Sequence, residues 1–82
     1  MLFNNLVDAK NIMGSVTKLL PIDNPYYEDF QFFSSINCTT SLEYREELKS
    51  FLEKFIINHA ILSMPDNVMN IYPLLVKLYG WL

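Results

Sequence analysis

The sequence predicts an all-α protein, a small four-helix bundle whose last helix is kinked or split at Pro73. Three observations lead to this fold class. Apolar residues recur every three or four positions in the longer segments, as they do along one face of a helix. Prolines and helix-capping residues separate these segments. The 82 residues are 51 % apolar with a net charge of −3, which permits a buried core and fits one helical domain over residues 1–82.

The first helix is expected from Leu2 to Leu20. Its apolar stripe consists of Leu2, Leu6, Ala9, Met13, Val16 and Leu20. Gly14 interrupts an otherwise good helical segment, which allows either a kink or a close approach by another helix. Pro21 should end the helix, because the residue before a proline is driven out of the helical conformation.

The second helix is expected from Pro25 to Ser35. Asn24 is a favoured N-cap, proline suits the first helical position, and two acids follow where the helix dipole is positive. The aromatic residues that share one face are Tyr26, Phe30 and Phe33. Aromatic residues also favour strands, but the capping signals make a helix the better interpretation.

The third helix is expected from Ser41 to Ser63. Thr40 and Glu43 have the spacing of a capping box. The apolar stripe steps through Leu48, Leu52, Phe55, His59 and Leu62. Because His59 falls on this stripe, we expect it at the edge of the core or inside it, with a hydrogen-bond partner.

The fourth helical segment begins near Pro65, where Ser63 and Asp66 resemble a second capping box. Apolar residues surround this segment, so it should lie centrally or meet another chain. Pro73 should kink or split it, because proline removes a backbone hydrogen bond. Gly80 is expected just past its end.

Few residues are suited to chemistry. A single cysteine excludes a disulfide scaffold, and Cys38 is expected to be inert. Cys38 and His59 lie on different segments without a motif that would orient them as a catalytic pair. The chain has no zinc-binding or calcium-binding motif and no glycine-rich phosphate loop. We therefore expect neither an enzyme nor a cofactor or metal site.

Composition also limits location and partners. The longest apolar run, Ile71 to Val76, is far shorter than the roughly 20 residues of a membrane span. The first residues lack the features of a secretory signal, and one thiol suits the cytoplasm. With a pI near 4.8, direct binding to nucleic acid is not expected.

The charge is unevenly distributed. From Pro21 to Glu47 there are six acidic residues and one basic residue, Arg45, whereas the rest of the chain carries a net charge of +2. The same stretch is rich in aromatic side chains, of which Tyr27 and Phe32 lie off the apolar face of the second helix. A surface that mixes carboxylates with aromatic rings is typical of a protein interface. The competing interpretation is that the rings fill the core and the acids only maintain solubility.

These observations predict a partner-binding surface and a function. The expected partner-binding residues are Asp23, Tyr26, Tyr27, Glu28, Asp29, Phe32, Glu43, Glu46 and Glu47. Acids that imitate phosphates suggest an immunity or antitoxin type of inhibitor, which occludes a basic protein that handles nucleic acid. The alternative is an all-α adaptor or structural subunit that joins a larger complex or forms a homodimer through the segment around Pro73.

Overall fold

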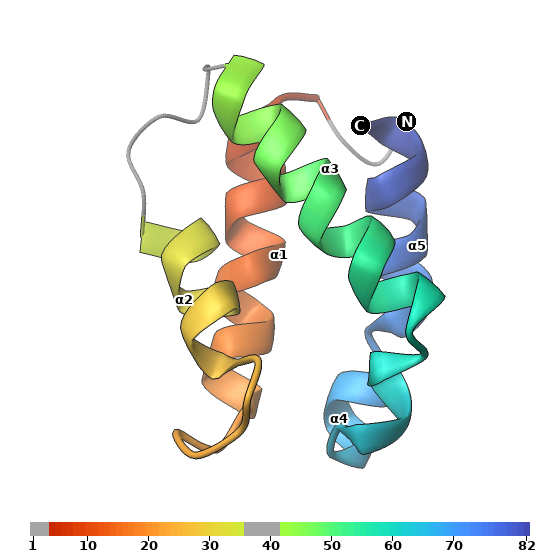
Figure 1. Ribbon diagram of the computed structural model, residues 1–82. Coiled ribbons are helices and arrows are strands. Elements are labelled where there is room, and N and C mark those ends of the chain that lie inside the picture. The colour runs from red at the N-terminus through yellow and green to blue at the C-terminus, as the bar shows by residue number, and fades with distance from the viewer. Residues whose placement is uncertain (1–3, 36–41) are drawn as a thin grey trace.

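The computed structural model describes residues 4–35 and 42–82, and all of the regular secondary structure in them is helical. The elements are α1 (Leu6–Leu19), α2 (Tyr27–Ser35), α3 (Leu42–Ile57), a 3-10 helix η1 (Ala60–Ser63), α4 (Asp66–Met69) and α5 (Tyr72–Trp81). The all-α prediction is confirmed, but these parts contain five α-helices and a 3-10 helix, where four helices were expected. Figure 1 shows α2 and α5 on opposite sides of the molecule, with α1 and α3 between them.

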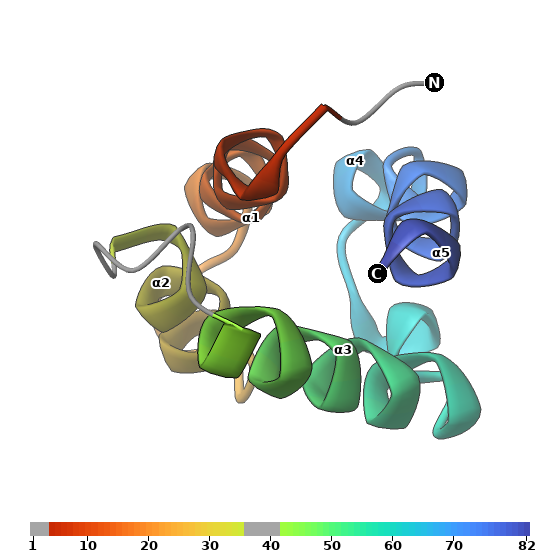
Figure 2. The same cartoon turned by 90° about the horizontal axis from the view of Figure 1, so that it is seen from above.

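Viewed from above, the helices surround a common interior (Figure 2). α1 supplies one side of it, and its predicted stripe is buried at Leu6, Ala9, Met13 and Val16. The helix begins after Asn5, whose side chain accepts the Val7 N–H at 2.9 Å as an N-cap. The expected start at Leu2 lies outside the described residues.

Gly14 of α1 faces α2. A β-carbon at this position would lie 3.6 Å from the β-carbon of Ser34, which is ordinary van der Waals contact. Gly14 therefore lies where α1 packs against α2, at a distance that would also admit a β-carbon.

α2 starts at Tyr27, two residues later than expected. The Asn24 side-chain oxygen accepts the Tyr26 N–H at 2.9 Å, so Asn24 stabilises the turn that leads into the helix and is not the residue next to its first turn. Phe30 and Phe33 are the buried residues of this helix.

α3 ends at Ile57, so the prediction of one continuous helix to Ser63 is wrong. His59 adopts a left-handed backbone conformation with φ = 51°, which terminates the helical path. The short η1 that follows buries Ala60 and Ile61 and leaves Leu62 exposed. His59 is itself exposed, which corrects its expected place at the edge of the core. The expected cap at Thr40 and the start at Ser41 lie outside the described residues.

The fourth segment consists of two helices. The Ser63 hydroxyl donates to the Ala60 carbonyl at 2.8 Å, and α4 begins without a side-chain cap, so the expected capping box is absent. Pro73 lies in the first turn of α5, where a missing N–H costs no helical hydrogen bond. The expectation that Gly80 follows the helix is wrong, since α5 continues to Trp81.

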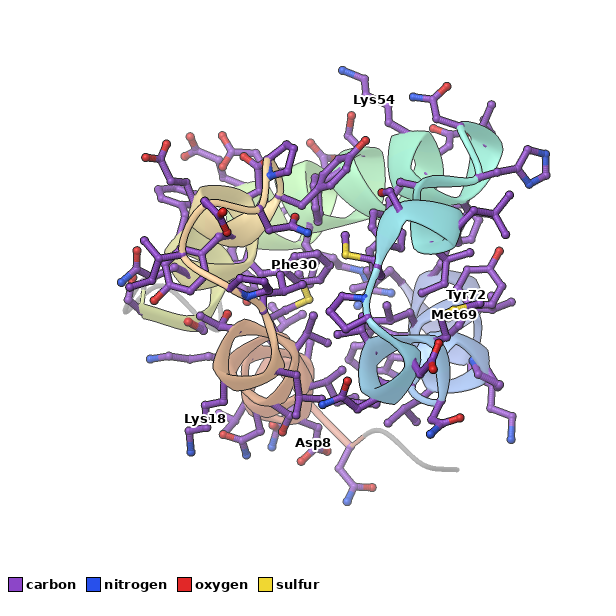
Figure 3. All side chains as sticks on the ribbon, turned by 90° about the horizontal axis from the view of Figure 1, so that it is seen from below. Asp8, Lys18, Phe30, Lys54, Met69 and Tyr72 are labelled. Carbon is purple, nitrogen blue, oxygen red and sulfur yellow. The ribbon has the colours of Figure 1, made fainter. Side chains whose placement is uncertain are left out.

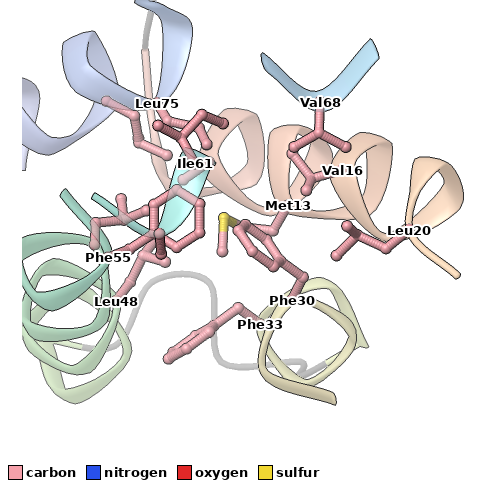
Figure 4. Packing of buried hydrophobic residues seen from close by; sticks show 14 of the residues in the cluster. Met13, Val16, Leu20, Phe30, Phe33, Leu48, Phe55, Ile61, Val68 and Leu75 are labelled. Atoms are coloured by element: carbon pink, nitrogen blue, oxygen red, sulfur yellow. The ribbon is translucent and has the colours of Figure 1, made fainter. Parts of the chain in front are cut away.

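The interior is filled by aliphatic side chains around a group of aromatic rings (Figure 4). Phe30 of α2 meets Phe51 and Phe55 of α3 edge to face, with ring centroids 5.2 and 5.6 Å apart. α5 contributes Leu75 and Leu78, and both are fully buried. Much of the apolar surface of the last segment is therefore used within the molecule.

Candidate protein-binding surface

The nine residues expected to bind a partner differ in exposure. Phe32 is 48 % exposed, whereas Tyr26 and Tyr27 are partly buried and pack against the core. The acidic members, all of them exposed, are Asp23, Glu28, Asp29, Glu43, Glu46 and Glu47. The acids and Phe32 are thus accessible to a partner, and the two tyrosines are accessible only in part.

The Tyr26 side chain, just before α2, packs against α3. Its ring meets Phe55 edge to face, with the centroids 5.5 Å apart. Its backbone N–H is the one capped by Asn24.

Phe32 is the exposed aromatic residue of α2. Its ring lies edge-on to the buried ring of Phe33, with centroids 5.2 Å apart. Phe33 in turn stacks on Phe51 of α3 at 5.4 Å. The ring of Phe32 is therefore supported from below, which reduces the side-chain entropy that binding would cost.

Both helices that carry this stacked pair of rings also carry exposed acidic residues. Asp29 precedes Phe33 by four residues, and Glu47 precedes Phe51 by four residues, so each carboxylate shares a helix face with one of the two rings. We define the acidic surface as Phe32 with the exposed carboxylates of the two helices, Glu28, Asp29, Glu43, Glu46 and Glu47. Asp23 lies apart in the turn before α2, where its neighbour Asn24 contacts Met64 Sδ at 3.8 Å.

Three of these acids also stabilise their own helices. Glu28 and Asp29 lie in the first turn of α2, and Glu43 lies in the first turn of α3. A negative charge there interacts favourably with the positive end of the helix dipole. Glu46 and Glu47 lie beyond the first turn of α3, so the helix dipole does not stabilise their charges in this way.

Arg45, the one base of the acidic stretch, faces away from the acidic surface. Its guanidinium donates to the carbonyl oxygen of Leu82 at 2.8 and 3.2 Å and to that of Trp81 at 3.2 Å. It also lies over the Trp81 ring, 5.1 Å from the centroid. The positive charge is therefore used at the end of α5, where a helix dipole is negative.

This role of Arg45 was not predicted from the sequence. The helical repeat held the signal, because one residue step rotates a side chain by about 100°, which separates Arg45 from Glu46 and Glu47 on the helix surface. The sequence did not show that α5 lies beside the face of α3 that carries Arg45.

The described residues were also searched for metal sites and membrane spans. Among residues 4–35 and 42–82, no three or more His, Cys, Asp and Glu side chains are grouped so that they could hold a metal ion. Within the same residues, none of the helices has the length and apolar character that crossing a membrane requires. Cys38 lies outside the described residues.

No family model, curated protein or solved structure matches this chain. The function proposed below rests on its residues and their arrangement.

Proposed function

We propose that this protein is a small protein-binding module, an inhibitor of the immunity or antitoxin type that occludes a basic, nucleic-acid-handling protein. The observation that carries the proposal is the separation of charge on α3. Glu46 and Glu47 are exposed, while the adjacent Arg45 is bound to the end of α5. Arg45 is therefore directed toward the end of α5 rather than toward Glu46 and Glu47.

Such a surface suits a cleft that normally binds phosphates. Carboxylates of two adjacent helices present several negative charges, and these attract a positively charged partner and accelerate association. Phe32 supplies an apolar contact among them. An aromatic residue near the centre of an interface commonly contributes a large share of the affinity. In this mechanism the charges determine the association rate and the ring slows dissociation.

The test is capture of partners from the native cell by the tagged protein, with two matched variants. Asp29→Asn with Glu47→Gln neutralises two carboxylates of the acidic surface. Glu53→Gln with Asp66→Asn neutralises two exposed carboxylates elsewhere. We expect a basic protein that the control variant retains, the surface variant loses and high salt releases.

The captured protein is then offered a labelled 20-nucleotide DNA or RNA with and without the inhibitor. We expect the inhibitor to prevent nucleic-acid binding. A captured protein that binds nucleic acid equally well in its presence would contradict the proposed inhibition. A partner that both variants retain equally would contradict the assignment of the surface.

A further inference from the structure

Phe32 lies on the side of α2 that faces away from α1. Ser34, two residues later, is the residue that meets Gly14 of α1. Two steps along an α-helix rotate a side chain by about 200°, so Phe32 and Ser34 project from nearly opposite sides of α2. Phe33, about 100° from Phe32, turns inward and stacks on Phe51 of α3. The ring of Phe32 therefore stands on the outer flank of α2, beside the contact with α3, and it is 48 % exposed.

Two carboxylates bracket this ring. Glu28 and Asp29 precede Phe32 by four and three residues, and these spacings place them one turn earlier, on either side of Phe32. Side chains of a helix lean toward its N-terminus, so the Phe32 ring extends over the turn that carries both acids. Both acids are exposed. This flank of α2 thus presents an aromatic ring between two negative charges.

The bases nearest to α2 in the sequence are both held apart from this flank. Lys18, the nearest before α2, projects outward from α1 (Figure 3), and α1 packs on the side of α2 that carries Ser34. Arg45, the nearest after α2, binds the end of α5. A partner that complements this flank therefore needs positive charges on both sides of a slot for a flat ring.

We propose that the partner binds single-stranded nucleic acid, and that Phe32 occupies the place of a base in its cleft. This inference rests on the proposed inhibition and specifies the class of partner. Proteins that bind single strands combine a positively charged groove, which follows the phosphates, with aromatic side chains on which the bases stack. The ring of Phe32 between Glu28 and Asp29 matches both features. A duplex keeps its base faces inside the stack, so a surface that binds a duplex contacts phosphates and base edges and needs no slot for a ring.

Two labelled probes test the class of partner. One is a 12-nucleotide single strand and the other is the same strand annealed to its complement, each made as DNA and as RNA. Fluorescence anisotropy measures their binding to the captured basic protein. We expect one of the single strands to bind at least tenfold more tightly than its duplex, and the wild-type chain to displace it. An abasic strand of the same length and charge should bind roughly tenfold more weakly, because stacking contributes about this much for each base.

Substitutions of Phe32 test the position of the ring. Phe32→Ala should displace the bound single strand only at about tenfold higher concentration than the wild type, because it can no longer fill the slot. Phe32→Trp keeps a flat ring and should displace the strand as the wild type does. Ile57→Ala is the matched control, since Ile57 is 65 % exposed at the far end of α3. Thermal melting monitored by circular dichroism shows that the three variants are folded.

Tighter binding of the duplex, equal binding of the abasic strand, or equal displacement by Phe32→Ala and Ile57→Ala would overturn this proposal. The inhibitor proposal survives each of these results if the wild-type chain still blocks the nucleic acid that the partner binds. A partner whose nucleic-acid binding the chain does not block contradicts the inhibitor proposal itself, and this inference with it.

Discussion

The Tyr44 hydroxyl donates a hydrogen bond to the carbonyl oxygen of Phe33 across 2.6 Å. Tyr44 is 2 % exposed, so this bond joins α3 to α2 inside the core. Phe33 lies in the last turn of α2, where carbonyl groups lack partners within the helix. Ser34 and Ser35 satisfy the preceding two carbonyls, those of Gln31 and Phe32. The end of α2 is thus closed by side chains, and Phe32 is held beside it.

Replacing Tyr44 with Phe should lower the free energy of unfolding by about 1–2 kcal/mol, because it leaves a buried carbonyl without its donor. Urea denaturation at pH 7 measures the change. Tyr72→Phe is the control, since Tyr72 is only partly buried and should cost less. Equal stability of Y44F and the wild type would show that this carbonyl has another donor.

Tyr44 should also make the fold sensitive to alkaline pH. Burial raises the pKa of the Tyr44 hydroxyl to about 12. The unfolded chain loses this proton near pH 10 and the folded chain keeps it until about pH 12, so unfolding releases a proton in between. The contribution of the Tyr44 hydroxyl to the free energy of unfolding is therefore complete below pH 10. It falls by about 1.4 kcal/mol per pH unit between pH 10 and pH 12. The stability advantage of the wild type over Y44F, followed by urea denaturation from pH 9 to 12, should shrink across this window. A constant difference would contradict the burial of this hydroxyl.

Gly14→Ala should stabilise the protein by roughly 0.5–1 kcal/mol, because alanine has the higher helix propensity and restricts the unfolded chain. The new β-carbon fits at 3.6 Å from that of Ser34. Gly80→Ala, with open space around its β-carbon, is the comparison. Destabilisation of G14A but not of G80A would contradict a 3.6 Å spacing between residue 14 and Ser34.

His59→Gly should raise the melting temperature. A residue other than glycine pays about 1 kcal/mol for the left-handed conformation that His59 adopts. His59→Val should lower stability, because a β-branched side chain tolerates this conformation poorly. Differential scanning calorimetry of both variants gives the comparison. The opposite order would mean that the chain at residue 59 is not left-handed.

Arg45→Met should loosen the end of α5. It removes the hydrogen bonds to the Trp81 and Leu82 carbonyls and the contact over the indole ring. Trp81 is the only tryptophan, so its fluorescence reports directly on this contact. We expect faster quenching by acrylamide in R45M than in the control Lys54→Met, which changes an exposed base of the same helix. Identical quenching would contradict the role given to Arg45.

The sequence predicted elements wherever local signals and burial agreed. The stripe of α1 and the hydrogen bond that Asn24 makes before α2 are examples, since both depend on residues within one or two turns. The prediction failed at His59, because the helical spacing of apolar residues continues through this position in the sequence. In the structure His59 has a left-handed backbone conformation, and Ala60 and Ile61 after it are buried. That choice depends on packing against other elements, which no local pattern encodes.

The same distinction applies to the candidate surface. The count of acids between Pro21 and Glu47 and the place of Phe33 on the apolar face of α2 were available from the sequence, but the burial of Tyr44 was not. The direction in which Arg45 points depends on the position of α5. Which charges are left facing a partner is therefore a property of the tertiary structure.

The association rate of the captured basic protein tests the central claim most directly. It is measured at 50, 150 and 500 mM salt for the wild type, for D29N/E47Q and for the control E53Q/D66N. We predict that D29N/E47Q associates about tenfold more slowly than the control at 50 mM salt, and that the two converge at 500 mM as the charges are screened. Equal association rates for the two variants at low salt would contradict an acidic surface that guides a basic partner.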